Sequence, residues 1–79
     1  KSYFRLFQCY IALGQEQQAI QAITNAINSC DDNKIKGWYY NRRGSLYIEI
    51  DEMDLAFKDL EDSCKLEFLN SCEVLKMKK

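Results

Sequence analysis

Apolar side chains recur along the chain at intervals of three and four residues, the spacing of one face of an α-helix. The opening stretch "YFRLFQCYIALG" carries them at positions 3, 6, 7, 10, 11 and 13, and Gly14 then supplies a residue that commonly ends a helix. A second face follows in "EQQAIQAITNAINSC", with Ala19, Ile20 and Ile23 among glutamine and asparagine residues. The pattern predicts five helices, near residues 2–13, 16–30, 34–50, 53–68 and 71–78.

The stretch "SLYIEI", residues 45–50, is ambiguous because it alternates apolar and polar side chains as a half-buried strand would. Shifting the chain by 37 positions against itself aligns this stretch with the helical "QCYIAL" of residues 8–13. We therefore expect a helix here and no strand in the fold. The identical pairs in this alignment are Tyr3 and Tyr40, Arg5 and Arg42, Tyr10 and Tyr47, Ile11 and Ile48, and Ala19 and Ala56.

Small side chains stand where two helices of a pair would have to approach closely. Ala19 and Ala56 are equivalent in the two copies, and a larger side chain at either position would push the helices apart. Gly44 likewise allows a close approach from inside its helix, although glycine there costs about 1 kcal/mol of helix stability relative to alanine. Tyr10 and Tyr47 are expected to fill the space between the paired helices. We interpret these residues as scaffold that carries no chemistry.

Helix pairs that repeat every 34 to 37 residues or so resemble the tetratricopeptide repeat (TPR) family. Both copies match its ordered series of aromatic, glycine, alanine and large apolar positions. The departures are Phe7, Arg43 and Asp51, which replace a glycine, a leucine and a glycine, and no proline closes either repeat. The matched residues are Tyr3, Leu6, Tyr10, Gly14, Ala19, Ile23 and Ala26 in the first copy and Tyr40, Gly44, Tyr47, Ala56, Leu60 and Ser63 in the second.

The resemblance implies an all-α fold, an α-solenoid of two helix-turn-helix repeats over residues 1–33 and 34–70. Residues 71–79 are expected to form a capping helix or the start of a truncated third repeat, with Asn70 and Ser71 as N-caps. The alternative architecture is a four- or five-helix bundle without repeats. Because the chain opens on lysine and enters an apolar run at once, we expect a domain from a longer protein.

Composition limits the classes of function. The net charge of −1 argues against a general nucleic-acid binder, although residues 1–48 hold six basic and three acidic side chains and residues 49–79 hold five and nine. No stretch approaches the roughly 20 apolar residues of a membrane span, so no membrane partner is expected. There is no histidine and no glycine-rich phosphate loop. We assign the carboxylates of "DEMDLAFKDLED" mainly to the solvent face of a helix and expect no catalysis and no cofactor.

Four cysteines, Cys9, Cys30, Cys64 and Cys72, form no CxxC pair, and no histidine is present to complete a mixed zinc site. A disulfide framework is compatible with their number. Three of the four, however, fall at apolar positions of a helix face, where free cysteine is common. We therefore expect buried, reduced thiols, no bound metal, and a cytoplasmic protein, with a nuclear location left open.

The family resemblance implies a protein-protein interaction scaffold that binds a peptide or partner protein in its concave groove, lined by the first helix of each pair. The alternative is a structural element that self-associates through its open repeat ends. The lining transferred from the family is Lys1, Phe4, Arg5, Gln8, Ile11 and Ala12 in the first copy and Trp38, Asn41, Arg42, Ser45, Ile48 and Glu49 in the second. The expected peptide site comprises Phe4, Arg5, Gln8, Trp38, Asn41, Arg42 and Ser45.

Arg5 and Arg42 occupy equivalent positions, and two guanidinium groups on neighbouring helices can converge on a carboxylate or phosphate. An acidic peptide is therefore one option for the partner. Chaperone-binding members of the family grip a C-terminal carboxylate with lysine, asparagine and arginine. Arg42 fits one position of that clamp, but Arg5 and Gln8 stand where asparagine is common. The competing interpretation is that both arginines are solvated or pair with acidic residues of an adjacent helix.

Overall fold

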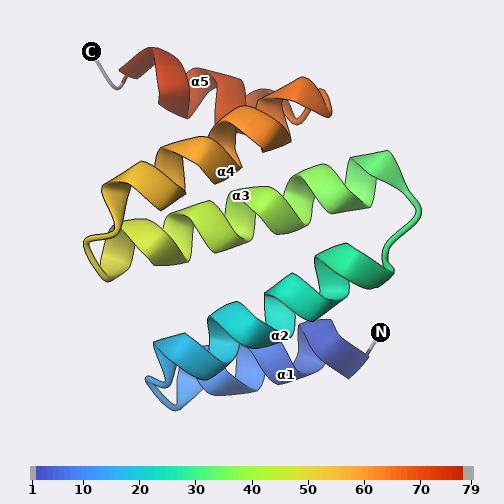
Figure 1. Cartoon of the computed structure of the whole chain (residues 1–79), viewed down its shortest axis with the longest axis vertical. Helices are drawn as coiled ribbons and strands as arrows, with labels where there is room; N and C mark the ends of the chain where they lie inside the picture. Colours follow the sequence, from blue (N-terminus) through green and yellow to red (C-terminus); the bar gives the residue numbers. More distant parts are fainter. Residues whose placement is uncertain (1, 78–79) are drawn as a thin grey trace.

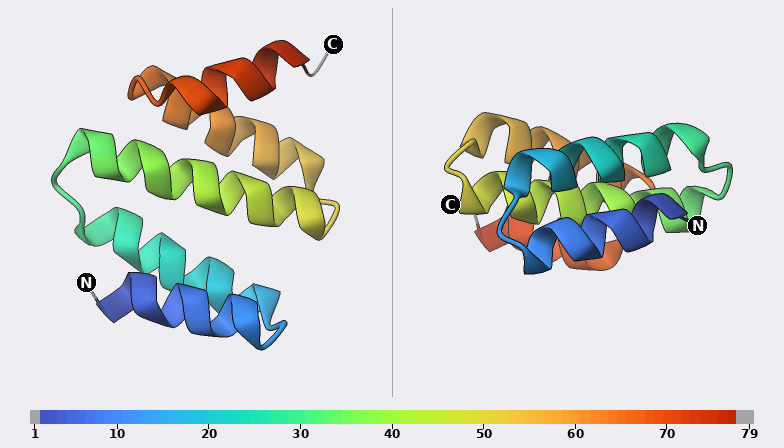
Figure 2. Two further views of the ribbon diagram at one scale, coloured as in Figure 1. Left: turned by 180° about the vertical axis from the view of Figure 1, so that it is seen from behind. Right: turned by 90° about the horizontal axis from the view of Figure 1, so that it is seen from below.

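The computed structural model describes residues 2–77, with side chains over residues 5–76. The helices are α1 (Ser2–Ala12), α2 (Glu16–Ser29), α3 (Asn33–Glu49), α4 (Met53–Lys65) and α5 (Leu69–Met77), and residues 2–77 contain no strand. Each helix runs antiparallel to the one before it, from α1 near one end of the long axis to α5 at the other (Figure 1). Figure 2 shows α1–α2 and α3–α4 as successive hairpins. The all-α prediction is confirmed, and "SLYIE" lies in α3.

Three helices end in the same backbone conformation. Gly14, Asp51 and Glu67 have positive φ angles of 74°, 66° and 68°. The residue after each donates its N–H to a carbonyl five residues back, a Schellman-type end. Only the first uses glycine, and a side chain in this conformation costs about 1–2 kcal/mol. The bonds are Gln15 N to Tyr10 O (2.9 Å), Glu52 N to Tyr47 O (2.8 Å) and Phe68 N to Ser63 O (3.2 Å).

Two predicted helix boundaries were wrong for local reasons. Helix α4 ends at Lys65, three residues before the predicted end, because the turn through Glu67 terminates it. Helix α5 begins at Leu69, so Asn70 and Ser71 lie within the helix and are not its N-caps. The start of α3 is capped by Asp32, whose side chain accepts hydrogen bonds from the backbone N–H groups of Lys34 (2.9 Å) and Ile35 (3.3 Å).

The buried core joins the first helix pair to α3. Within each pair the helices approach as the small residues predict, since Ala19 and Ala56 have no exposed surface. A Cβ atom added at Gly44 would lie 3.1 Å from Leu60 Cγ and 3.2 Å from the Ala56 carbonyl oxygen, so glycine permits the contact of α3 with α4. The main cluster comprises Phe7, Ala19, Ala22, Ile23, Ala26 and Leu46, with Tyr10, Ile20 and Tyr39 packed against it.

An ion pair lies inside the contact between the two repeats. Arg43 Nε and Nη2 donate to the carboxylate of Asp59 at 2.7 and 2.8 Å, and Arg43 Nη1 donates to Thr24 Oγ1 at 2.9 Å. This clasp (Arg43, Asp59 and Thr24) connects α3, α4 and α2. The hydrogen bond with Asp59 raises the pKa of Arg43. Asp59 is an exception to the expected solvent face of α4, because it is only 3% exposed.

Helix α5 is attached to the second repeat by buried serines and a disulfide. Asn41 Nδ2 donates to Ser71 Oγ (2.8 Å), which donates to Ser63 Oγ (2.7 Å), and Ser63 in turn donates to the Gly37 carbonyl. Cys64 and Cys72 form a disulfide with their Cα atoms 4.9 Å apart. The prediction of reduced core thiols was therefore wrong for this pair.

The other two cysteines are free, but neither is a core residue. Cys9 is exposed and Cys30 is half-buried. An amphipathic pattern marks a position as suitable for a small apolar side chain, and a disulfide between two helices satisfies that pattern equally well. The reducing compartment inferred from the cysteines therefore loses its support.

Candidate functional site

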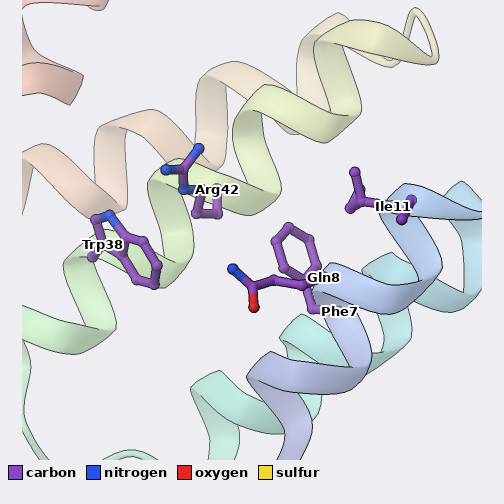
Figure 3. Close-up of a pocket in the computed structure, with 6 residues that line it drawn as sticks. Phe7, Gln8, Ile11, Trp38 and Arg42 are labelled. Atoms are coloured by element: carbon purple, nitrogen blue, oxygen red, sulfur yellow. The ribbon is translucent and has the colours of Figure 1, made fainter.

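A hollow of about 400 Å³ opens between α1 and α3, the first helices of the two pairs. Figure 3 shows Trp38 and Arg42 on α3 and Phe7, Gln8 and Ile11 on α1, on opposite sides of this space. Most of its wall is apolar, with polar groups contributed by Gln8 and Arg42. We call it the Trp38 hollow; its lining is Phe7, Gln8, Ile11, Ala12, Trp38 and Arg42.

A second hollow of about 140 Å³ continues along the same two helices. It shares Phe7, Ile11 and Arg42 with the Trp38 hollow, so the two form one surface feature, which we call the trough. This part is the Glu49 hollow, lined by Phe7, Ile11, Arg42, Ser45, Leu46 and Glu49.

Helical periodicity explains why these residues meet. Trp38, Arg42, Ser45 and Glu49 follow one another at intervals of four, three and four residues, so they form one stripe along α3. On α1, Phe7 and Gln8 each have a partner four residues later, Ile11 and Ala12, which also line the trough. The continuous helices α1 and α3 therefore hold both walls without any loop.

Arg42 carries the free positive charge of the trough. Its Cζ atom lies 5.1 Å from the centroid of the Trp38 ring, a cation–π contact that restrains the side chain. The cation–π contact uses none of its N–H donors in a hydrogen bond, so they remain available to a ligand. Arg42 is exposed, and among the described residues no carboxylate pairs with it. Arg43, the next residue, is instead occupied by Asp59.

The structure brings together part of the expected peptide site. Gln8, Trp38 and Arg42 line the Trp38 hollow, and Ser45 lines the Glu49 hollow. Asn41 is engaged with Ser71 of α5 and lines neither. Arg5 is exposed and likewise lines neither hollow. Phe4 lies in α1, but its side chain falls outside the described residues.

Sequence reasoning did not include Phe7 and Leu46 among the lining residues. Both are nearly buried, with exposed fractions of 6% and 2%, and form part of the core as well as the floor of the trough. Phe7 did leave a signal, because it stands where the resembled repeat has glycine. A large aromatic side chain at such a position must occupy space beside the helix.

The comparison with protein families agrees with this geometry. The profile of the tetratricopeptide repeat matches residues 1–33 and 39–68. The chain belongs to the tetratricopeptide repeat family. TPR repeats are generally protein-protein interaction modules, and the two matched segments cover α1–α2 and most of α3–α4.

The searches of curated proteins and of solved structures each found no match. None of the helices within residues 2–77 is both long and apolar enough to cross a membrane. Over the same residues, no group of three or more histidine, cysteine, aspartate or glutamate side chains is placed to hold a metal ion.

Proposed function

We propose that this TPR chain is a non-catalytic scaffold that binds a peptide or a segment of a partner protein in the trough between α1 and α3. The observation that carries the proposal is the combination of an apolar hollow with an arginine that has no carboxylate partner and makes a cation–π contact with tryptophan. Tryptophan and arginine are the residues most enriched at binding hot spots, and an apolar wall supplies the burial that anchors a side chain.

The proposed site residues are Gln8, Trp38, Arg42 and Ser45 in the trough, with Arg5 and Asn41 as peripheral contacts. Phe4, whose side chain lies outside the described residues, is proposed as a further contact. Asn41 is bonded to Ser71, so its contribution requires that a ligand share or replace that bond. Arg5 is free to reach a ligand that extends past the Trp38 hollow. The proposal does not require the three-repeat clamp of chaperone-binding members.

Peptides selected from a random library displayed on phage would test the proposal. Trp38 is the only tryptophan in the chain, so its fluorescence reports directly on occupation of the trough. Arg42→Ala should weaken binding by about 1.5–3 kcal/mol, the range for hydrogen bonds to a charged group, with unchanged helicity. Arg5→Ala is the matched control, because it removes the equivalent arginine from outside both hollows and should have a smaller effect.

Two results would count against the trough as the site. One is a library selection that yields no peptide able to change the fluorescence of Trp38. The other is an Arg42→Ala variant that unfolds while its folded fraction keeps full affinity, since Arg42 would then be a structural residue.

A second candidate function, self-association, is favoured by a hollow of about 190 Å³ at the free end of the first repeat. Leu6 and Ala22 of this end hollow are equivalent to Arg43 and Asp59 of the second repeat. There Arg43 bonds to Thr24 of α2. No helix within the described residues covers the first repeat in the same way, and Leu6 is 44% exposed. The lining is Leu6, Tyr10, Gln18, Gln21, Ala22 and Asn25.

Analytical ultracentrifugation over a range of concentrations separates the two functions. A sedimentation coefficient that rises with concentration, and no longer rises in Leu6→Glu, would support association through the free end. A monomer at every concentration that still binds a selected peptide would leave the trough as the functional surface.

A further inference from the structure

The trough carries two charged side chains of opposite sign that do not neutralise each other. Over residues 5–76 the ion pair is that of Arg43 with Asp59, and neither Arg42 nor Glu49 has an oppositely charged partner. Both are exposed, and both line the Glu49 hollow. Each could therefore receive a charged group from a ligand without first losing an internal bond.

The helix fixes the separation of the two positions that carry these charges. Arg42 and Glu49 are seven residues apart on α3, which at 1.5 Å per residue is about 10 Å along the helix axis. That separation exceeds the reach of side-chain pairs three or four residues apart on a helix. Ser45 and Leu46 lie between them on α3, and Phe7 and Ile11 face them from α1. The charges thus mark two ends of a mainly apolar surface.

We propose that the trough binds a peptide segment with a carboxylate and a basic group about 10 Å apart and an apolar side chain between them. The carboxylate lies at Arg42 beside Trp38, and the basic group lies at Glu49. This inference rests on the proposed function and specifies the partner of the same site. In an extended chain the two groups are about three residues apart, and in a helix about seven.

The charge pattern distinguishes this ligand from the acidic peptide expected from the recurrence of arginine. A segment with only acidic groups would place one of them near Glu49, and a segment with only basic groups would place one near Arg42. At physiological ionic strength charges are screened only beyond about 8 Å, so two like charges brought into contact in the trough would repel each other. The trough therefore selects the direction in which a peptide binds as well as the composition of that peptide.

The test is a phage selection from a random 12-residue library against the 79-residue chain and against Arg42→Glu/Glu49→Arg. The wild type should enrich peptides that share one order of acidic, apolar and basic residues. For a synthetic peptide of that group, exchanging its acidic and basic residues should weaken binding at least tenfold. Trp38 fluorescence measures the affinity. The charge-exchanged variant should prefer the exchanged peptide by a similar factor.

A matched control is Asp54→Lys/Lys58→Glu, which exchanges two exposed charges on α4 that line neither hollow and preserves the net charge. It should select the same peptides as the wild type. Enriched peptides without a preferred charge order, or a charge-exchanged variant with unchanged preference, would overturn the inference and leave the proposed function standing. Failure to enrich any peptide that perturbs Trp38 would overturn the proposed function, and the inference with it.

Discussion

The two repeats share one backbone plan but differ at equivalent positions that face a neighbour. Leu6 and Ala22 of the first repeat line a hollow at the free end of the stack. Their equivalents in the second repeat are Arg43 and Asp59, which form a buried ion pair under α2. The position of Ala26 is likewise taken by Ser63, which bonds to Ser71 of α5.

The difference lies in the contacts that these positions make. In the first repeat they hold apolar residues, whereas in the second repeat they hold polar groups that bond to one specific neighbour on α2 or α5. In the second repeat those groups fix where α2 and α5 lie. The clasp and the hydrogen-bonded pair Ser63 and Ser71 therefore define the stacking of the helices, in addition to the apolar contacts that supply most of the burial.

Breaking the clasp should produce the largest loss of stability. Asp59→Ala leaves the Arg43 guanidinium largely buried without its carboxylate, and loss of one partner of a buried pair costs about 3 kcal/mol or more. Urea unfolding followed by circular dichroism measures the change. Glu61→Ala, an exposed residue of the same helix, should change stability by less than about 0.5 kcal/mol.

A double substitution tests whether the stability of this site depends on the charges or only on filling the space with paired side chains. Arg43→Leu/Asp59→Ala installs the pair found in the first repeat, and Thr24 remains bonded to the Ile20 carbonyl at 2.7 Å. Because an apolar replacement can equal a buried ion pair, most of the stability lost in Asp59→Ala should return. A double variant as unstable as the single one would show that the charges themselves are required.

Breaking the disulfide should produce the second largest loss of stability. Cys64 and Cys72 close a loop of nine residues, since they are eight positions apart, and in the chain-entropy model such a link contributes about 2.5 kcal/mol. Reduction, or Cys64→Ser/Cys72→Ser, should lower the melting temperature by about 10 °C or more, and hydrogen exchange should show the loss concentrated in α5. Cys9→Ser should leave both measurements unchanged, because this cysteine is free and exposed.

The sequence predicted the features that depend on helical periodicity. Five helices, the repeat, the close contacts at Ala19, Gly44 and Ala56, and the lining by Gln8, Trp38 and Arg42 all follow from the position of a residue along a helix. Such positions are fixed locally, so a short stretch of sequence contains the information.

The features that were missed depend on which helices meet. The bond of Asn41 to Ser71 could be known only once α5 was placed. The pairing of Cys64 with Cys72 has the same origin. Arg43 and Asp59 did leave a signal, since two charges of opposite sign replace the apolar pair of the other repeat, but Thr24 from a third helix completes the arrangement.

The smallest effect concerns the turn after the first helix of each repeat, where Gly14 and Asp51 are equivalent and share the left-handed conformation. Asp51→Gly should stabilise the protein by about 0.5–1 kcal/mol, because relief of the backbone strain exceeds the added entropy of glycine in the unfolded chain. Gly14→Asp should destabilise it by a similar amount. The two changes form a matched pair, since both residues are exposed and a Cβ atom at Gly14 would meet nothing within 4 Å. Urea unfolding of both variants provides the measurement. If Asp51→Gly instead lowers the stability, the carboxylate of Asp51 makes a favourable contribution that outweighs the strain, and the turns of the two repeats are held by different interactions.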